Sequence, residues 1–243
     1  MELMKTANKP FDLQGTVNTR ELGGYSDKKL NILNKQKLLR SDLLSNLTKE
    51  DSEWLYKYNI RTVVDLRRER EIREEPSKLE HFRDVNYFNI SLSTNDSGLM
   101  EDRKIDSLSA LYQTYLTERQ IEIKEIMEII SKSLSGGGVI FNCMAGKDRT
   151  GIISMLLLKI CDVDHEIIKS DYEVSEGYII NYLNEKKHEF NDDFPDFLLR
   201  SERIEMEKTL SFMEANYGTV ENYMEHIRVK SEVLNTIRTN LIG

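Results

Sequence analysis

The residues from Val139 to Gly151 constrain the fold of this chain more than any other stretch. The stretch begins with an apolar run directly after three glycines, and this pattern predicts a buried strand. A short loop of small and polar residues follows. From Arg149 onward, apolar residues recur at helical spacing, which predicts a helix. The sequence therefore places Cys143 where a strand ends and Arg149 where a helix begins.

A strand, loop and helix in this order form a suitable site for a phosphate. The helix N-terminus offers unpaired N–H groups and the positive end of a dipole, and a curled loop adds further N–H donors. The same positive field favours the thiolate form of Cys143, which is the nucleophilic form of cysteine. Arg149 supplies a permanently charged, planar fork that matches two oxygens of a phosphoryl group.

Five residues separate Cys143 from Arg149, and the loop reads Cys143-Met144-Ala145-Gly146-Lys147-Asp148-Arg149-Thr150-Gly151. It resembles the phosphate loop of the cysteine-dependent phosphatases. The Lys-Asp version is typical of bacterial tyrosine and lipid phosphatases of the PtpB/LipA type. The resemblance implies that Cys143 and Arg149 are catalytic and that no metal or other cofactor is needed. It also implies substrate contacts from Met144, Ala145, Gly146, Lys147 and Thr150.

Two other interpretations of the loop are weaker. A nucleotide-binding loop would need Gly-x-x-x-x-Gly-Lys-Ser/Thr. Phe141 stands at the first glycine position and Asp148 at the Ser/Thr position, so this interpretation fails. A buried structural cysteine would explain Cys143, but it would not explain the Gly-Lys-Asp-Arg-Thr cluster that follows.

Other segments resemble the same family. The turn that contains Gly23 and Gly24 follows Arg20 and resembles an Asn-x-Arg-Asp-Leu-Gly-Gly signature, with Glu21 in place of the usual Asp. This resemblance implies that Arg20 lies near the site and binds substrate; by itself the segment would be a plain hairpin turn. Further similar segments are Leu38 to Ser41, Asp171 to Ser175 and Tyr217 to Glu221.

The acid that would protonate the leaving group has two candidates. Asp148 lies inside the loop and is the first choice, and Asp65 at the end of a predicted strand is the second. Asp65 could equally be a structural carboxylate paired with a nearby arginine. Thr150 is placed to donate its hydroxyl to the sulfur. Many relatives have His before the nucleophile where this chain has Asn142, so we expect lower activity or activity shifted to higher pH.

The substrate stays open at this stage. A cation at Lys147 could meet additional phosphates, so phosphotyrosine, phosphoserine or phosphothreonine in proteins, and phosphoinositides are all candidates. Two rival functions use a similar loop: a catalytically weak phosphate-binding module, and a sulfur enzyme of the arsenate-reductase or rhodanese kind. The second rival needs another thiol, and Cys161 lies about three helical turns away.

The predicted fold is a single α/β domain over residues 1–243, with a mainly parallel sheet of four or five strands and helices on both faces. Residues 176–216 alternate apolar clusters with heavy charge and predict a helical insertion, with a break at 191–195. This insertion is either a lid over the site or a subdomain that never moves. Residues 93–104 are polar and predict a surface loop, and the charge run Arg67–Glu75 predicts a solvated helix face.

Composition excludes several classes of protein. The 243 residues carry a net charge of −8, which argues against nucleic acid as the main partner. The two cysteines do not form a disulfide framework, and the four histidines show no metal-ligand spacing. No apolar run is long enough for a membrane span, and the first ten residues lack a signal-peptide pattern. We therefore expect a cytoplasmic protein, with export by another route and the oligomeric state left open.

Overall fold

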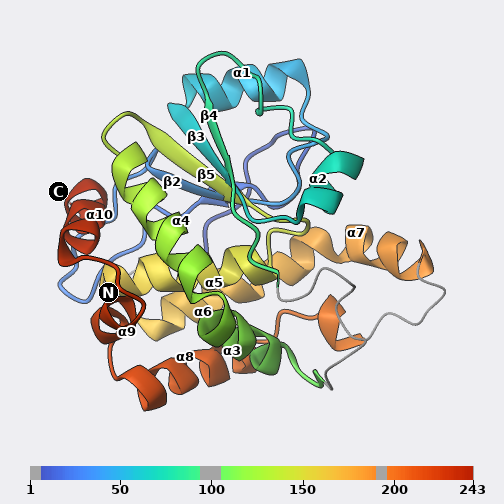
Figure 1. The fold of residues 1–243 in the computed structure, drawn as a ribbon. Coiled ribbons are helices and arrows are strands. Elements are labelled where there is room, and N and C mark those ends of the chain that lie inside the picture. The colour runs from blue at the N-terminus through green and yellow to red at the C-terminus, as the bar shows by residue number, and fades with distance from the viewer. Residues whose placement is uncertain (1–6, 94–104, 190–195, 243) are drawn as a thin grey trace.

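The computed structural model, which describes residues 7–93, 105–189 and 196–242, contains one sheet of five strands. The strand order is β1-β2-β5-β3-β4 (Figure 1). The last four strands in that order run parallel, and only β1 pairs in the antiparallel sense. The strands are β1 (Arg20–Glu21), β2 (Leu38–Ser41), β3 (Ile60–Asp65), β4 (Asn86–Asn89) and β5 (Gly138–Asn142).

Alternation along the strands explains why helices cover both faces of the sheet. Leu39, Val63 and Ile140 point to the face covered by α1 (Lys49–Lys57), where they belong to one buried cluster. Their neighbours Leu38, Val64 and Phe141 belong to the larger cluster on the opposite face. There the sheet packs against α4 (Gln120–Ser133) and α5 (Asp148–Ile160) (Figure 1).

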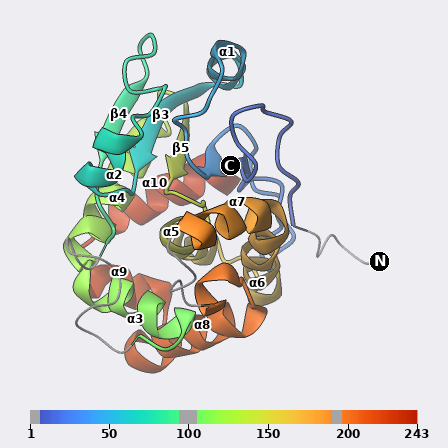
Figure 2. The same cartoon turned by 90° about the vertical axis from the view of Figure 1, so that its right-hand side faces the viewer.

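The remaining helices extend the larger core and pack around α5. Helix α5 runs through the middle of this helical region (Figure 2). Its apolar residues are buried on all sides, as expected of a central helix. The other helices are α2 (Glu69–Glu74), α3 (Leu108–Glu118), α6 (His165–Glu173), α7 (Ser175–Glu189), α8 (Arg203–Tyr217), α9 (Val220–His226) and α10 (Ser231–Ile242), with a 3₁₀ turn at Asp196–Leu199.

Several helix boundaries follow from local chemistry. Thr48 and Asp51 form a reciprocal capping box at the start of α1, and Asp164 caps α6 through the Glu166 amide. Helix α8 ends at Gly218, whose φ of +79° is accessible to glycine at little cost. At these three positions, residues within a few places along the chain set where a helix starts or stops.

The predicted α/β class and the mainly parallel sheet are confirmed. The short strand β1 was not predicted, because two residues are too few to show an alternating pattern. Helix α5 begins one residue earlier than expected, at Asp148. Residues 94–104 of the loop predicted at 93–104, and the break predicted at 191–195, lie outside the described residues.

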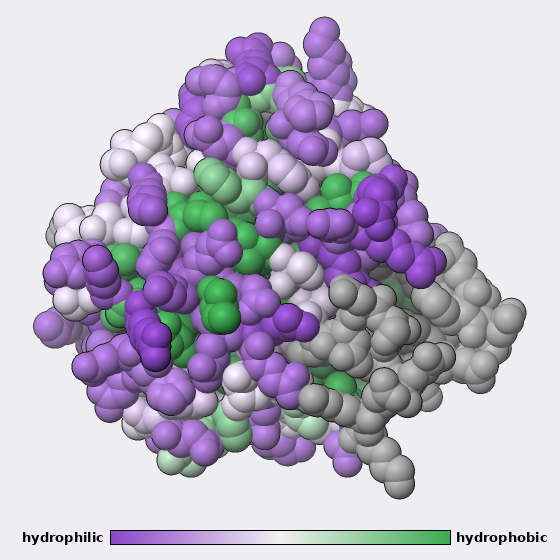
Figure 3. Space-filling model, in the orientation of Figure 1, coloured by the Kyte–Doolittle hydropathy of each residue, from purple (hydrophilic) through white to green (hydrophobic). Residues whose placement is uncertain are grey.

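Polar side chains cover most of the face shown in Figure 3, with apolar groups visible between them. This distribution agrees with a charged fraction of 31%. Within the described part of the chain, none of the helices has the length and apolar character needed to cross a bilayer.

Replacing Leu156 in the middle of α5 with alanine is expected to lower the free energy of unfolding by about 2–5 kcal/mol, because its side chain is completely buried. Urea unfolding would measure this change. The matched control is Ile121→Ala on α4, where the side chain is 79% exposed and the change should stay within about 0.5 kcal/mol. Similar losses in both variants would contradict the central position of α5.

Candidate active site

The loop with Cys143 leaves the central strand β5 at the carboxyl edge of the parallel strands. This edge is where open α/β sheets bind ligands. Cys143 is 2% exposed, and α5 starts five residues later at Asp148. The predicted strand, loop and helix are therefore confirmed, with the nucleophile candidate at the base of the loop.

The loop turns its carbonyl groups outward, toward the surrounding protein. In a trans peptide unit the C=O and the following N–H point in opposite directions. Three outward carbonyls therefore direct the amides of Ala145, Gly146 and Lys147 toward the inside of the loop, as anion binding requires. The three outward hydrogen bonds run from Leu43 N to Met144 O (3.0 Å), from Asn18 Nδ2 to Ala145 O (2.9 Å) and from Arg40 Nη2 to Gly146 O (2.7 Å).

Gly146 is required by two independent features of the loop. Its φ of +66° lies in the left-handed region that favours glycine. A Cβ atom at this position would also lie 2.6 Å from the Asp42 nitrogen and from the Ser41 carbonyl group. The loop can therefore press against the end of β2 only because this residue has no side chain.

A buried ion cluster of Arg20, Arg40 and Asp171 is linked to the loop through the hydrogen bond from Arg40 to Gly146 O. Asp171 on α6 accepts hydrogen bonds from Arg20 Nε (3.2 Å) and from Arg40 Nη1. Burial acts to raise the pKa of Asp171, but the charges of Arg40 and Arg20 outweigh it and lower the pKa. Sequence comparison suggested Arg20 as a substrate contact. In the structure Arg20 is completely buried and also donates to Asn18 and Ser175, so its position is that of a support.

Arg149 is held by a carboxylate that the sequence did not single out. Its Nη1 and Nη2 atoms donate to the two carboxylate oxygens of Glu71 on α2, both at 2.8 Å. Nη1 also lies 3.2 Å from Ser93 Oγ. Nε has no hydrogen-bond partner among the described residues. This geometry leaves the edge formed by Nε and Nη2 open for two phosphoryl oxygens.

The charge run Arg67–Glu75 is therefore more than the solvated face that was predicted. Glu71 is mostly buried, whereas Glu69 and Arg70 on the same helix are exposed. Burial acts to raise the pKa of Glu71, but hydrogen bonding to Arg149 outweighs it and lowers the pKa to about 2. The eight charged residues of this run gave no signal that Glu71 would face inward.

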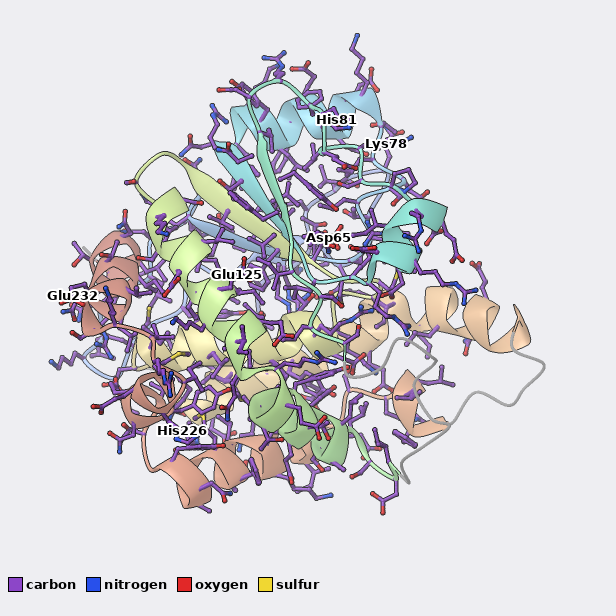
Figure 4. All side chains as sticks on the ribbon, in the orientation of Figure 1. Asp65, Lys78, His81, Glu125, His226 and Glu232 are labelled. Carbon is purple, nitrogen blue, oxygen red and sulfur yellow. The ribbon has the colours of Figure 1, made fainter. Side chains whose placement is uncertain are left out.

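The two candidate acids occupy different environments. Asp148 begins α5, and its side chain is 25% exposed. Asp65 lies where β3 meets α2 (Figure 4) and is completely buried. Its carboxylate accepts from Arg67 and from the Tyr87 hydroxyl (2.8 Å), and this is the structural pairing that the sequence left as an alternative. Asp148 is therefore the better placed of the two candidates.

Lys147 is completely buried and does not offer its charge to solvent. Its ammonium group donates to the carbonyl oxygens of Leu198 (2.5 Å) and Arg200 (2.7 Å) and lies 3.5 Å from Asp148 Oδ1. Lys147 thus ties the loop to the segment between α7 and α8. The expectation that it meets further phosphates finds no support in these contacts.

Two buried side-chain polar atoms within residues 142–150 have no hydrogen-bond partner in the described structure. They are Thr150 Oγ1 and Asn142 Oδ1, on either side of the loop. The Asn142 amide nitrogen donates to the Cys143 carbonyl (3.4 Å). The predicted hydrogen bond from Thr150 to the sulfur stays a prediction, with a hydroxyl that is free to make it.

Comparison with known proteins agrees with this geometry. A family model described as "Tyrosine phosphatase family" matches residues 11–243. The chain belongs to this tyrosine phosphatase family. The match includes the loop and the segments that hold Arg20, Arg40, Glu71 and Asp171, so the whole described site falls within it.

Two relatives align with long parts of the chain. A tyrosine-protein phosphatase of Nostoc commune is 32% identical over 146 residues, which are 58% of this chain and 49% of the relative. The triple specificity protein phosphatase PtpB of Mycobacterium tuberculosis is 26% identical over 189 residues, 66% of this chain and 67% of PtpB. The chain thus spans about half to two thirds of these relatives. The crystal structure of P. aeruginosa TpbA has a TM-score of 0.41 at 13% identity, covering 84% of this chain and 95% of TpbA.

Glu71→Gln is expected to lower the free energy of unfolding by about 1–3 kcal/mol near neutral pH, because glutamine cannot neutralise Arg149. Since the pKa of Glu71 is lowered to about 2, the ion pair is fully formed above the ordinary carboxyl pKa and is lost as pH falls toward 2. The difference in the free energy of unfolding between variant and wild type should therefore disappear in acid. Urea unfolding at several pH values would measure it. Glu69→Gln, on the exposed face of α2, is the control and should change little.

The contribution of Asp42 to the free energy of unfolding should have the opposite pH dependence. Burial raises the pKa of Asp42 from 3.8 to about 6, although its carboxylate accepts from the amides of Val17 and Asn18. Its contribution to stability is therefore present at low pH and is lost as pH rises from about 4 to about 6. In Asp42→Asn, the fall in the free energy of unfolding between about pH 4 and about pH 6 should be smaller by on the order of 2 kcal/mol. Urea unfolding at several pH values would measure it. An unchanged decline in the variant would refute the assignment.

Proposed function

We propose that this protein is a cysteine-dependent phosphatase that hydrolyses phosphotyrosine in proteins through a phosphocysteine intermediate. The observation that carries the proposal is the loop around Cys143. Its carbonyls are tied outward, its amides turn inward, and Arg149 keeps one edge open beside it. Such a preorganised array of donors stabilises the charge that gathers on equatorial phosphoryl oxygens.

The proposed reaction has two steps. The Cys143 thiolate attacks phosphorus, a sulfur–phosphorus bond forms, and the bond to the leaving oxygen breaks. Asp148 gives its proton to that oxygen, so that a neutral phenol departs. A water molecule then attacks phosphorus while the Asp148 carboxylate takes its proton, and the bond to sulfur breaks to release inorganic phosphate and the thiolate. The positive field comes from the loop amides and Arg149, and Thr150 would donate its hydroxyl to the sulfur.

Phosphotyrosine is favoured over phosphoinositides by the position of Lys147. A headgroup with several phosphates needs cations beyond those that bind the reacting phosphoryl group, and the ammonium of Lys147 is occupied by two carbonyls. Phosphoserine, phosphothreonine and phosphoinositides belong in the same test, since one relative is named a triple specificity phosphatase. We also propose a cytoplasmic location, which cell fractionation would test.

We further propose that the described part of residues 176–216, which is 176–189 and 196–216, forms an anchored wall beside the site and does not open as a lid. Ala145 of the loop packs against Ile179 and Leu183 of α7 and against Leu199. Lys147 binds the same region through two carbonyl groups. Moving this segment would break these contacts and leave a buried ammonium without partners, which is costly.

Phosphate release from a phosphotyrosine peptide, a phosphoserine peptide and phosphoinositides tests the function, with a chelator present throughout. Cys143→Ser should reduce release by about a thousandfold or more, because the hydroxyl is a far weaker nucleophile. Asp148→Asn should reduce it by about a hundredfold or more. Phosphotyrosine should be the best substrate, and rapid acid quenching should trap phosphate on Cys143.

Cys161→Ser is the matched control, because Cys161 is the other cysteine and lies at the far end of α5. Burial raises the pKa of Cys161 to about 12, so its thiol is not a nucleophile at neutral pH. This variant should keep its activity. Release that survives Cys143→Ser would overturn the mechanism, and no release from any substrate would favour the phosphate-binding module.

A further inference from the structure

The first turns of α3 bring two tyrosines to the active site. Tyr112 and Tyr115 lie one turn apart and are both almost completely buried. The Tyr112 hydroxyl donates to Asp148 Oδ1 at 2.5 Å. It also lies 2.7 Å from the hydroxyl of Tyr172 on α6. Two linked hydroxyl groups, one from α3 and one from α6, therefore lead to the side chain of the proposed acid on α5.

These contacts fall on one oxygen of Asp148. Oδ1 accepts from Tyr112 and lies 3.5 Å from the Lys147 ammonium, whereas Oδ2 has no hydrogen-bond partner among the described residues. When Asp148 is neutral, a hydrogen bond accepted by Oδ1 places the proton on Oδ2. Oδ2 is then the atom that carries the transferable proton.

Tyr112 is suited to act as a permanent donor. Burial, followed by the charge of Asp148, raises the pKa of Tyr112 well above its usual value, so the phenol keeps its proton. Its partner is fixed as well, because the ring of Tyr172 lies against Gly151 in the first turn of α5. A Cβ atom on Gly151 would lie 3.3 Å from Tyr172 Cδ2. The first turn of α5 and the hydroxyl chain are thus packed as one unit.

We propose that Tyr112 is a positioning residue for general-acid catalysis: its hydroxyl holds Oδ1 of Asp148 and directs Oδ2 toward the leaving oxygen. Tyr112 itself transfers no proton. During phosphoryl transfer the electron pair of the breaking P–O bond moves to the leaving oxygen, which takes the proton from Oδ2, and the Tyr112 hydrogen bond then stabilises the new carboxylate. The inference rests on the proposed function, because it assigns Asp148 as the acid.

The test compares leaving groups. Phenyl phosphate releases a phenol as basic as tyrosine and needs the acid, whereas p-nitrophenyl phosphate releases a stabilised anion and needs it little. Tyr112→Phe should lower kcat/KM about tenfold for phenyl phosphate and less than about twofold for p-nitrophenyl phosphate. Asp148→Asn should show the same selectivity with larger losses. Adding Tyr112→Phe to Asp148→Asn should cause no further loss for phenyl phosphate.

Two further variants separate positioning from structure. Tyr223→Phe removes another buried hydroxyl that binds α3, where it donates to the Leu116 carbonyl at 2.9 Å, and it should leave the leaving-group dependence unchanged. Tyr172→Phe keeps the bond between Tyr112 and Asp148 and should give a smaller loss with the same selectivity. Thermal unfolding of each variant would show whether the fold is retained.

The outcomes distinguish this inference from the proposed function. Equal losses on both substrates in Tyr112→Phe, or losses additive with Asp148→Asn, would overturn the positioning role. If Asp148→Asn itself showed no leaving-group dependence, the acid assignment would fail, and this inference would fail with it. If wild type and Cys143→Ser released phosphate equally, the proposed function would fail whatever Tyr112 does.

Discussion

A loop that surrounds an anion must turn its carbonyl dipoles away from it, and much of this structure serves that requirement. The carbonyls of Ala145 and Gly146 are bound by Asn18 and Arg40, which come from the first 40 residues of the chain. These outward hydrogen bonds fix the orientation of the peptide units, and so they hold the loop amides on the inside. Buried carbonyls without partners would also be costly in their own right. The N-terminal segment is thus part of the site, although it supplies none of the reacting groups.

The buried charges follow from the same requirement. Burial, followed by the positive charge of Arg40, lowers the pKa of Arg20. Asp171 lies between the two guanidinium groups and compensates for part of that cost. Glu71 plays the corresponding role for Arg149. Each arginine near the loop is therefore oriented by a carboxylate, and the orientation of Arg149 leaves one edge free for an anion.

Different helices supply the side chains around this loop. Helix α5 supplies Asp148 and Arg149 from its first turn, α2 supplies Glu71, and α3 supplies Tyr112. The segment between α7 and α8 is fixed to the loop through Lys147. In this arrangement a side chain that looks like a substrate contact in the sequence can instead be a structural tether. A side chain in a charge run can equally be essential for orientation.

The sequence by itself determined the strand, loop and helix around Cys143, the α/β class and the capped helix ends, because these depend on periodicity and on neighbours within a few residues. Residue types at short spacing in the loop also indicated the phosphatase family. Only the tertiary structure decided which charges are paired. Glu71 and Arg149 are 78 residues apart, and Tyr112 and Asp148 are 36 residues apart. Partners at such distances meet only when the helices pack, so the different environments of Asp148, Asp65, Arg20 and Lys147 depend on burial and contacts that no local pattern records.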